Sequence, residues 1–376
     1  MHNSHLPIGP SHPMLVEPAR FLFKIEGERV KEVEINLGYT HKGIEKLLES
    51  KNYIQAVPVV ERICGICSHC HASNFCYMIE KLDNLEIPER AKYIRTIAAE
   101  LERMHSHLLC LALTMEDIGQ RTLFMHLMDM REKVVDAFEE FSGGRVHHSI
   151  NTIGGVRYDI DDNSKRMIER TANEISEYSK KLGRIIMNNK TIRGRLEGNG
   201  VLTKEEAKTL GVVGPVARGS GVNNDVRRAV PYGKYSEIDF EIPLRDEGDS
   251  LARTMIRVDE ILESAKIITE CLKKMQPGEL KIKWMGKPRE GEQVHLVEAP
   301  RGENLHYVVS KGERNPYRVK IRPPSFANMQ AAATVLEDAR VSDIPPAVIS
   351  LDPCLSCTER TAYLDKRGIA YVEYRG

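Results

Sequence analysis

Four cysteines in two CxxC pairs are the residues of this chain whose type and spacing point most directly to chemistry. The first pair is Cys64 and Cys67, the second is Cys354 and Cys357, and most of the chain lies between them. Thiolates bind soft and borderline metals, and a pair spaced in this way offers two sulfurs to one site. A site that combines both pairs can form only in the folded chain. The sequence therefore predicts a soft-metal site that depends on the complete fold.

Other uses of these cysteines are open at this point. A structural zinc site is one, although its two cysteine pairs usually lie tens of residues apart. A local Fe–S cluster on Cys64, Cys67, Cys70 and Cys76 is another, but the spacing to Cys76 and the missing proline after it fit poorly. A thioredoxin-like redox pair needs a βαβ setting, which the pattern lacks. The functional interpretation is a catalytic centre of two metals, in which each pair supplies one terminal and one bridging sulfur.

The flanks of the cysteines add groups that can tune such a site. Arg62 and Arg360 are cations beside anionic thiolates. His71 follows Cys67 by one helical turn, so it can face the same site and donate a hydrogen bond to a sulfur. The alternative for His71 is a structural histidine.

Composition excludes several classes of function. The chain has 376 residues, 54 basic against 54 acidic, and 41% hydrophobic residues, which is ordinary for a globular protein with a large core. Balanced charge argues against nucleic acid as the main ligand. No apolar run approaches the ~18–20 residues of a membrane span, and the N-terminus lacks the features of a signal peptide. We expect a cytoplasmic protein, peripheral to the inner face of the cell membrane through partner subunits.

Eight cysteines are too few for a disulfide scaffold in a chain of this length. Six of them gather near the two motifs. Cys110 and Cys271 stand apart, and we expect both to be small buried hydrophobic residues.

Periodicity predicts a mainly α fold: a large helical bundle with a small N-terminal β-hairpin and further short strands. The pattern predicts a loop at residues 1–13 and the hairpin at residues 21–38. Thr203 with Glu206 predicts a helix start. One domain is expected over residues 1–360, followed by a tail at 361–376. Apolar spacings of three and four predict helices at 41–50, 89–141, 163–190, 203–208, 253–275 and 326–337, an ordered loop at 211–247, and strands within 278–322.

The ordered loop carries a group of mixed charges. Arg218, Asp225, Arg227 and Arg228 lie close together in the sequence. We expect them to form a solvated or interface ion-pair network.

The motifs resemble those of a known family. Arg62-x-Cys64-Gly65-x-Cys67-x-x-x-His71 with Asp352-Pro353-Cys354-x-x-Cys357 is similar to the paired signature of [NiFe]-hydrogenase large subunits. The resemblance is to the membrane-associated, energy-converting branch, which is related to the quinone-site subunit of complex I; that subunit lacks the four cysteines. Further stretches carry the resemblance over nearly the whole chain, namely 9–13, 38–46, 214–221, 298–302 and 315–326.

The resemblance implies a Ni–Fe(CN)₂(CO) centre and a role for each cysteine. Cys64 and Cys354 would be terminal nickel ligands, while Cys67 and Cys357 would bridge nickel to iron. The reaction would be 2H⁺ + 2e⁻ ⇌ H₂, with Cys354 accepting the proton.

Two further residues take implied roles. Glu17, within Val16-Glu17-Pro18, looks like the relay carboxylate; otherwise it is a surface glutamate. Arg301 would place a guanidinium over the open side of the metals; otherwise it is a turn arginine.

Glu45 resembles a carboxylate that helps to hold Mg²⁺ in soluble relatives. Those relatives supply a histidine where this chain has Arg360, and a guanidinium cannot ligate a metal. This difference argues against Mg²⁺, and we expect Glu45 to pair with an arginine instead. The tail at 361–376 follows the point where many family members are cut, so it is either removed in maturation or retained.

The resemblance also implies partners. They are a small subunit with a proximal [4Fe–4S] cluster, ferredoxin-linked electron-transfer subunits and antiporter-like integral membrane subunits, with Fe–S clusters in the partners rather than in this chain. Two other functions stay open: a complex I-like redox subunit that reduces a quinone or a sulfur compound, and a structural zinc-binding subunit.

Overall fold

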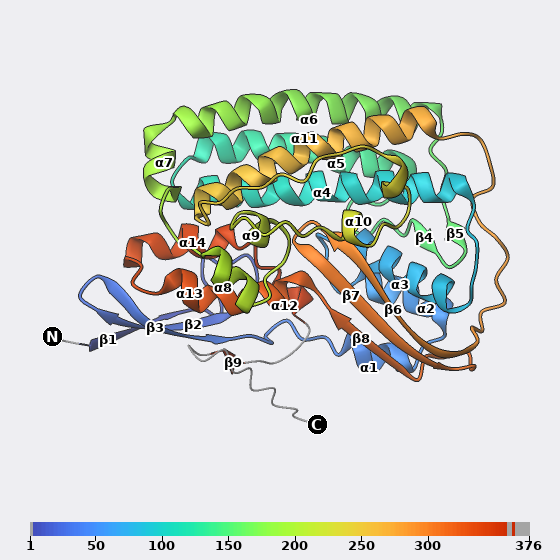
Figure 1. The fold of residues 1–376 in the computed structure, drawn as a ribbon, viewed down its shortest axis with the longest axis horizontal. Helices are drawn as coiled ribbons and strands as arrows, with labels where there is room; N and C mark the ends of the chain where they lie inside the picture. Colours follow the sequence, from blue (N-terminus) through green and yellow to red (C-terminus); the bar gives the residue numbers. More distant parts are fainter. Residues whose placement is uncertain (1–2, 359–362, 365–376) are drawn as a thin grey trace.

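The structure is a computed structural model that describes residues 3–358 and 363–364. Four long helices run side by side along one edge of the molecule (Figure 1). Their apolar faces form one large core cluster, as the spacing of the sequence predicts. These helices are α4 (Glu89–Asp117), α5 (Arg121–Ser142), α6 (Asp162–Asn188) and α11 (Ser250–Lys274).

The predicted continuous helix at 89–141 is wrong, because the structure divides it into α4 and α5. Gly119 lies between them with φ of 79°, a left-handed conformation that ends an α-helix. The other long helices agree with the prediction within a few residues. Asp161 and Asp249 cap α6 and α11 by accepting hydrogen bonds from Ser164 N and Ala252 N.

The N-terminal sheet is antiparallel with the order β1-β2-β3-β9. The predicted hairpin is confirmed: β2 (Arg20–Glu26) and β3 (Arg29–Asn36) pair around a tight turn. The loop predicted for residues 1–13 is wrong in part, because Asn3–Ile8 forms strand β1. Pro7 is tolerated there because β1 lies at the edge of the sheet. Strand β9 (Tyr363–Leu364) pairs with β3 on its other side.

A second antiparallel sheet packs against α3 at the other end of the molecule (Figure 1). It contains β6 (Glu290–Ala299), β7 (Gly302–Lys311) and β8 (Arg318–Arg322), within the segment predicted to form strands. The short strands β4 (Asn151–Thr152) and β5 (Gly155–Val156) pair with each other. Beside these sheets lie three helices: α1 (Ile44–Glu49), which begins later than predicted, and α2 (Tyr53–Glu61) and α3 (Ser68–Leu82), which were not predicted.

Short helices connect the bundle to the sheets. The predicted capping box at Thr203 and Glu206 is confirmed at the start of α8. The helix predicted at 326–337 is broken into shorter pieces, and the loop at 211–247 contains two short α-helices. All the short helices of this part of the molecule are α7 (Lys190–Leu196), α8 (Lys204–Thr209), α9 (Gly214–Arg218), α10 (Val226–Ala229), η1 (Tyr235–Glu237), α12 (Pro324–Asn328), η2 (Met329–Ala331), α13 (Ala332–Leu336), η3 (Val341–Asp343), α14 (Ile344–Ser350) and η4 (Leu355–Cys357).

The fold is mainly α with small antiparallel sheets, as predicted. Within the part of the chain that the structure describes, no helix combines the length and apolar character needed to cross a membrane. Arg360 lies outside the described residues, as does the tail at 361–376 apart from the two residues of β9. The domain boundary at residue 360 therefore stays a prediction.

Candidate metal centre

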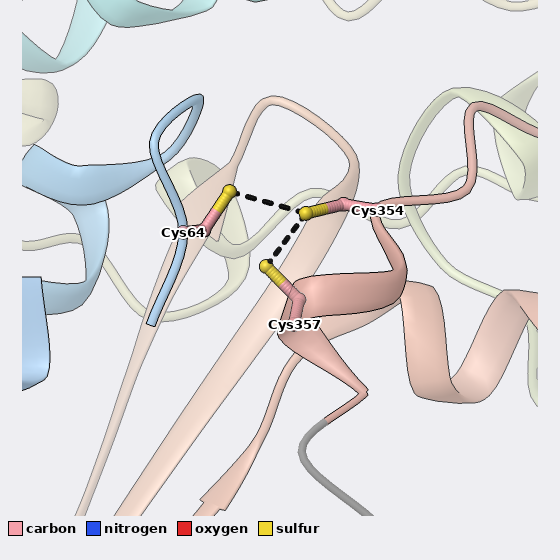
Figure 2. A group of neighbouring side chains, drawn as sticks. All are labelled: Cys64, Cys354 and Cys357. Atoms are coloured by element: carbon pink, nitrogen blue, oxygen red, sulfur yellow. Dashed lines mark hydrogen bonds between the residues drawn. The ribbon is translucent and has the colours of Figure 1, made fainter. Parts of the chain in front are cut away.

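Two loops from distant parts of the sequence form the centre. Cys64 lies between α2 and α3, and Cys67 is the residue that directly precedes α3. The second loop follows α14, where Asp352 turns the chain with a left-handed φ of 57° that aspartate tolerates better than most residues. Figure 2 shows Cys64 from the first loop facing Cys354 and Cys357 from the second. All four cysteines are buried.

The cysteines of the two loops lie opposite one another in the same order. The Sγ atoms of Cys64 and Cys354 are 3.1 Å apart, and those of Cys67 and Cys357 are 3.3 Å apart. Cys354 Sγ also lies 3.1 Å from Cys357 Sγ. The first cysteine of one motif thus contacts the first of the other, and the second contacts the second. The division into two terminal and two bridging ligands stays a prediction.

Four sulfurs this close cannot all be ionised without a cation. Hydrogen bonds from Cys354, Cys357 and Cys67 hold the pKa of Cys64 well below its usual range, although burial opposes this. Contacts with Cys354 raise the pKa of Cys67 and of Cys357 well above the usual range. As a set of four thiolates, the cluster needs positive charge from metals. The chemistry of this donor set fits a centre of two soft metals.

Cys70 and Cys76 do not join this set. Neither belongs to a group of possible metal ligands among the described residues, whereas each of the four CxxC cysteines does. Burial raises the pKa of both thiols. The local Fe–S cluster is therefore not supported. Cys110 and Cys271 are buried, as predicted.

Arg301 is anchored beside the sulfurs. It lies in the turn between β6 and β7, where the backbones of Gly214 and Gly302 approach so closely that a Cβ atom on either would collide with the other segment. Its Nε donates to the carbonyl of Asp352 at 2.8 Å, its Nη2 to Asp352 Oδ1 at 2.7 Å, and its Nη1 to Ser106 Oγ at 2.9 Å.

The charge of Arg301 is held firmly in this position. Burial opposes the charge, but Asp352 and the nearby Cys354 and Cys64 raise the pKa of Arg301 well above its usual range. The alternative of a surface turn arginine is wrong, because the residue is buried. A fixed cation next to anionic ligands can orient small polar diatomic groups.

His71 lies directly behind the second cysteine pair. Its Nε2 is 3.6 Å from Cys357 Sγ, a distance that suits a hydrogen bond to sulfur. Burial lowers the pKa of His71 to about 4, so the ring is neutral. Its Nδ1 faces His306 Nε2 at 3.2 Å and Asn304 Nδ2 at 3.3 Å. Sequence analysis did not identify His306 and Asn304 as part of the site, although their spacing of two in a strand places both on one face.

Glu17 contacts the second cysteine loop from the N-terminal side. Its Oε2 accepts a hydrogen bond from Ser356 N at 2.8 Å, and its Oε1 accepts one from Ser356 Oγ. Ser356 stands between the two cysteines of that loop. The carboxyl group is half-buried, so it lies between the cysteine loop and the surface.

One other residue differs from expectation. The side chain of Arg62 is 52% exposed; it lies 3.6 Å from Glu61 and donates to the carbonyl of Pro58 rather than facing the sulfurs. Arg301 supplies the nearby cation instead. Glu45 accepts hydrogen bonds from Lys320 Nζ at 2.8 Å and from Ile321 N at 2.9 Å. Its pairing with an arginine stays a prediction.

Glu102 is a further residue that the sequence did not reveal. It reaches from α4 and accepts hydrogen bonds from His69 N at 2.6 Å and Cys70 N at 2.8 Å, in the first turn of α3. It thereby fixes the helix that begins just after Cys67. Burial raises the pKa of Glu102 to about 8, although both N–H groups favour the ionised form. A glutamate in a long helix gives no sequence signal for such a contact.

The mixed-charge loop is buried, so the solvated network predicted there is wrong for most of its members. Arg218, Asp225 and Arg227 are at most 2% exposed, and only Arg228 lies at the surface. Arg218 donates to Glu260 and Glu298 at 2.8 Å each. Burial costs these charges their hydration, and opposite charges on α4, α11 and β6 offset the loss. The contacts that do so cannot be read from the loop alone.

These features are consistent with a metal site, and the comparisons with known proteins place the chain in a family of oxidoreductase subunits. The model of the 49 kDa subunit of respiratory-chain NADH dehydrogenase matches residues 117–287 and 282–360. The model of nickel-dependent hydrogenases matches residues 42–112, which include the first cysteine pair.

Individual relatives match over almost the full length. The carbon monoxide-induced hydrogenase of Rhodospirillum rubrum is 38% identical, covering 94% of this chain and 99% of the relative. The membrane-bound hydrogenase subunit alpha of Pyrococcus furiosus is 38% identical, covering 95% and 87%. A subunit of the NADH-quinone oxidoreductase of Chloroherpeton thalassium is 36% identical, covering 93% and 86%.

A solved structure shares the fold. It is a chain of the membrane-bound sulfane sulfur reductase, an archaeal respiratory membrane complex, with a TM-score of 0.91, 33% identity and coverage of 95% of this chain and 98% of that chain. The chain belongs to the family that joins the 49 kDa subunit of complex I with the large subunit of [NiFe] hydrogenases. Its cluster of four cysteines is consistent with a Ni–Fe active site.

Proposed function

We propose that this chain is the catalytic subunit of an energy-converting [NiFe] hydrogenase, which interconverts 2H⁺ + 2e⁻ and H₂. The observation that carries the proposal is the buried meeting of all four cysteines, with Sγ atoms of the two motifs 3.1 Å and 3.3 Å apart. Complex I-type relatives share the fold but need no such ligand set. Four converging thiols are the ligand set that a Ni–Fe centre requires.

Each residue of the centre has a proposed role. Cys64 and Cys354 would hold nickel as terminal ligands, and Cys67 and Cys357 would be ligands shared by nickel and iron. When bound, the Ni–Fe(CN)₂(CO) centre supplies the reversible heterolytic cleavage of H₂. Cys354 Sγ holds the proton. Arg301, fixed by Asp352, orients the small ligands on the open side of the metals.

Glu17 moves the proton away from the centre. It accepts two hydrogen bonds from Ser356, inside the loop that carries Cys354, and it is half-buried. A carboxyl group in this position can receive a proton on one side and release it toward solvent on the other. His71 donates a hydrogen bond to Cys357 and lowers the electron density on that sulfur.

The subunit needs partners for electrons and for ion movement. The partners proposed are a small subunit with a proximal [4Fe–4S] cluster, a ferredoxin-linked chain of electron-transfer subunits, and antiporter-like integral membrane subunits. Support comes from relatives that are named as membrane-bound hydrogenase and respiratory membrane complex. The chain would then be cytoplasmic and peripheral to the membrane. No Mg²⁺ is proposed at Glu45, whose carboxylate oxygens are taken by Lys320 and Ile321 N.

Infrared spectroscopy with metal analysis of the purified complex tests the proposal. The expected result is CO and cyanide stretching bands, nickel and iron in the preparation, and H₂ formation with reduced ferredoxin. Cys357→Ser should abolish the bands and the activity, whereas the matched control Cys271→Ala, a buried cysteine away from the centre, should keep both. Zinc without CO and cyanide bands would overturn the proposal in favour of a structural metal site.

A second candidate is a complex I-like reductase of a quinone or a sulfur compound. It is favoured by the relatives of that kind, which include the sulfane sulfur reductase at a TM-score of 0.91. The same preparation distinguishes the two. Turnover of polysulfide or a quinone that survives Cys357→Ser, without H₂ formation, would establish the second candidate.

A further inference from the structure

A buried row of polar side chains fills the contact between α3 and strand β7. His71 and Asn74 are one helical turn apart on α3, so they share a face. Asn304 and His306 are two positions apart on β7 and also share a face. All four side chains are fully buried. Most buried polar groups are hydrogen-bonded. In this row only Asn304 Oδ1 and His306 Nδ1 have no partner among the described residues.

The hydrogen bonds of this row have a direction. His295 Nδ1 lies 2.8 Å from Asn74 Oδ1, which can only accept, so His295 donates. Asn74 Nδ2 then donates to the carbonyl of Asn304 at 2.8 Å. The amide of Asn304 turns its Nδ2 toward Cys70 Sγ at 3.6 Å and toward His71 Nδ1 at 3.3 Å. Each donor points along the row toward the cysteine cluster.

The state of His71 follows from what surrounds its two nitrogens. Nδ1 faces an amide N–H of Asn304 and the ring nitrogen Nε2 of His306 at 3.2 Å. A neutral imidazole carries one N–H, so a ring that accepts at Nδ1 must carry its proton on Nε2. That nitrogen lies 3.6 Å from Cys357 Sγ. The opposite tautomer would set a lone pair of His71 against the lone pairs of the sulfur.

His306 supports the same tautomer. Its ring stacks on His71 with centroids 5.4 Å apart, and its Nδ1 is buried without a hydrogen-bond partner among the described residues. If His306 donates from Nε2, the unpaired atom is an acceptor; if it accepts, the unpaired atom is an N–H. A buried unpaired donor is the rarer and less favourable case. Both neighbours of Nδ1 therefore act as donors.

We propose that Asn304 and His306 are positioning residues that hold His71 as the Nε2–H tautomer, so that it donates its hydrogen bond to the bridging thiolate of Cys357. This inference rests on the proposed function, since it assigns a purpose to the row only if Cys357 ligates the metals. Hydrogen bonds to a ligating sulfur withdraw electron density from it and tune the potential of the metal site. Asn304 and His306 would thus set the potential without contacting a metal.

The CO stretching frequency of the purified complex tests the inference. Less hydrogen bonding makes the thiolate a stronger electron donor, which increases back-donation to CO and lowers the frequency. We expect a clear downward shift in His71→Phe and a smaller shift in the same direction in Asn304→Leu. The midpoint potential should become more negative in the same order.

A double variant separates positioning from structure. In the His71→Phe background, Asn304→Leu should cause no further shift, because the group through which it acts is gone. A matched control is Asn151→Leu, which removes another buried amide that bonds a histidine of α3: Asn151 Nδ2 lies 3.0 Å from His69 Nδ1. His69 faces the carbonyl of Arg95 and not a sulfur, so this control should leave the bands in place.

The outcomes are distinct. Bands at an unchanged frequency in Asn304→Leu would overturn this inference and leave the proposed function standing. An additional shift of the same size in the His71→Phe background would also overturn it, because Asn304 would then act by another route. Wild-type complex without CO and cyanide bands would overturn both proposals.

Discussion

Two buried carboxylates on α4, Glu100 and Glu102, stand two residues apart and belong to two different regions. Glu100 accepts a hydrogen bond from Arg227 Nη1 at 3.1 Å. It belongs to a buried arginine–carboxylate network, which also includes Arg218, Asp225, Glu260 and Glu298. Glu102 lies beside the cysteine centre, and its partners among the described residues are the backbone N–H groups of His69 and Cys70. Burial raises the pKa of both, but Arg103 and Arg227 outweigh it at Glu100, so only Glu102 ends above its usual range.

The difference between these regions is where the compensating charge comes from. In the network, Arg218 and Arg227 neutralise carboxylates from α4, α11 and β6, so the region is complete within the chain. In the cysteine centre, four sulfurs converge with Arg301 as the nearby cation, so bound metals are the proposed source of the remaining positive charge. One region pairs its charges within the chain, and the other gathers thiols that are consistent with a metal site.

The largest effect is expected from breaking the network. Arg218→Met leaves Glu260 and Glu298 buried without their main counter-charge, which should lower the free energy of unfolding by about 3–5 kcal/mol. Denaturant unfolding of the purified subunit measures it. Arg228→Met, next to the exposed Asp239, is the matched control and should cost about 0–1 kcal/mol. Equal losses would mean that burial is not what makes Arg218 important.

The two carboxylates should respond to pH in opposite ways. The pKa of Glu102 is about 8 in the folded protein against an ordinary 4.5, so its stabilising contribution is present below pH 4.5 and is lost as pH rises to 8. The free-energy difference between wild type and Glu102→Gln should fall across this window by up to roughly 1.4 kcal/mol per pH unit.

Glu100 provides the contrast. Its folded pKa is lowered, so its contribution is present above 4.5 and is lost only as pH falls below that value. The corresponding difference for Glu100→Gln should therefore stay constant where that of Glu102→Gln falls. Unfolding curves at several pH values measure both. Parallel slopes for the two variants would contradict the distinction between the regions.

Within the cysteine centre, the fixed cation should matter more for reaction than for folding. Arg301→Lys keeps the charge but loses the two-point contact with Asp352. We expect H₂ formation to fall by about 10²-fold with nickel and iron retained. Arg245→Lys, which alters a half-buried pair with Asp259, should keep its activity. A parallel loss of metal in Arg301→Lys would instead assign Arg301 to assembly of the centre.

The smallest effect is expected at the edge of the centre, where Lys320 pairs with the half-buried Glu45. Lys320→Ala should cost about 0.2–1 kcal/mol and leave H₂ formation unchanged. Because we propose no Mg²⁺ there, treatment of the wild type with EDTA should also leave activity unchanged. Stoichiometric magnesium in the wild type, lost together with activity in Glu45→Gln, would contradict this.

Much of the centre was predictable because it is carried by residue type. Cysteine pairs, His71 and the Arg301 turn stand in local motifs, and helix caps such as Thr203 are set by neighbours a few residues away. The predictions that failed concern breaks and burial. Gly119 separates two helices within a segment whose apolar spacing is continuous. Strand β1 forms by pairing with β2, which its own sequence does not reveal.

The sequence by itself determined which cysteines can form a metal site and where most of the long helices lie, since both depend on side-chain chemistry and on spacing within a few turns. Only the tertiary structure decided which charges lose water and which find partners. Asn304 lies 233 positions from His71 along the chain, yet its amide faces that ring. The sequence shows that Arg218 is charged. It does not show that Arg218 is buried between Glu260 and Glu298, because burial depends on every element that surrounds a side chain.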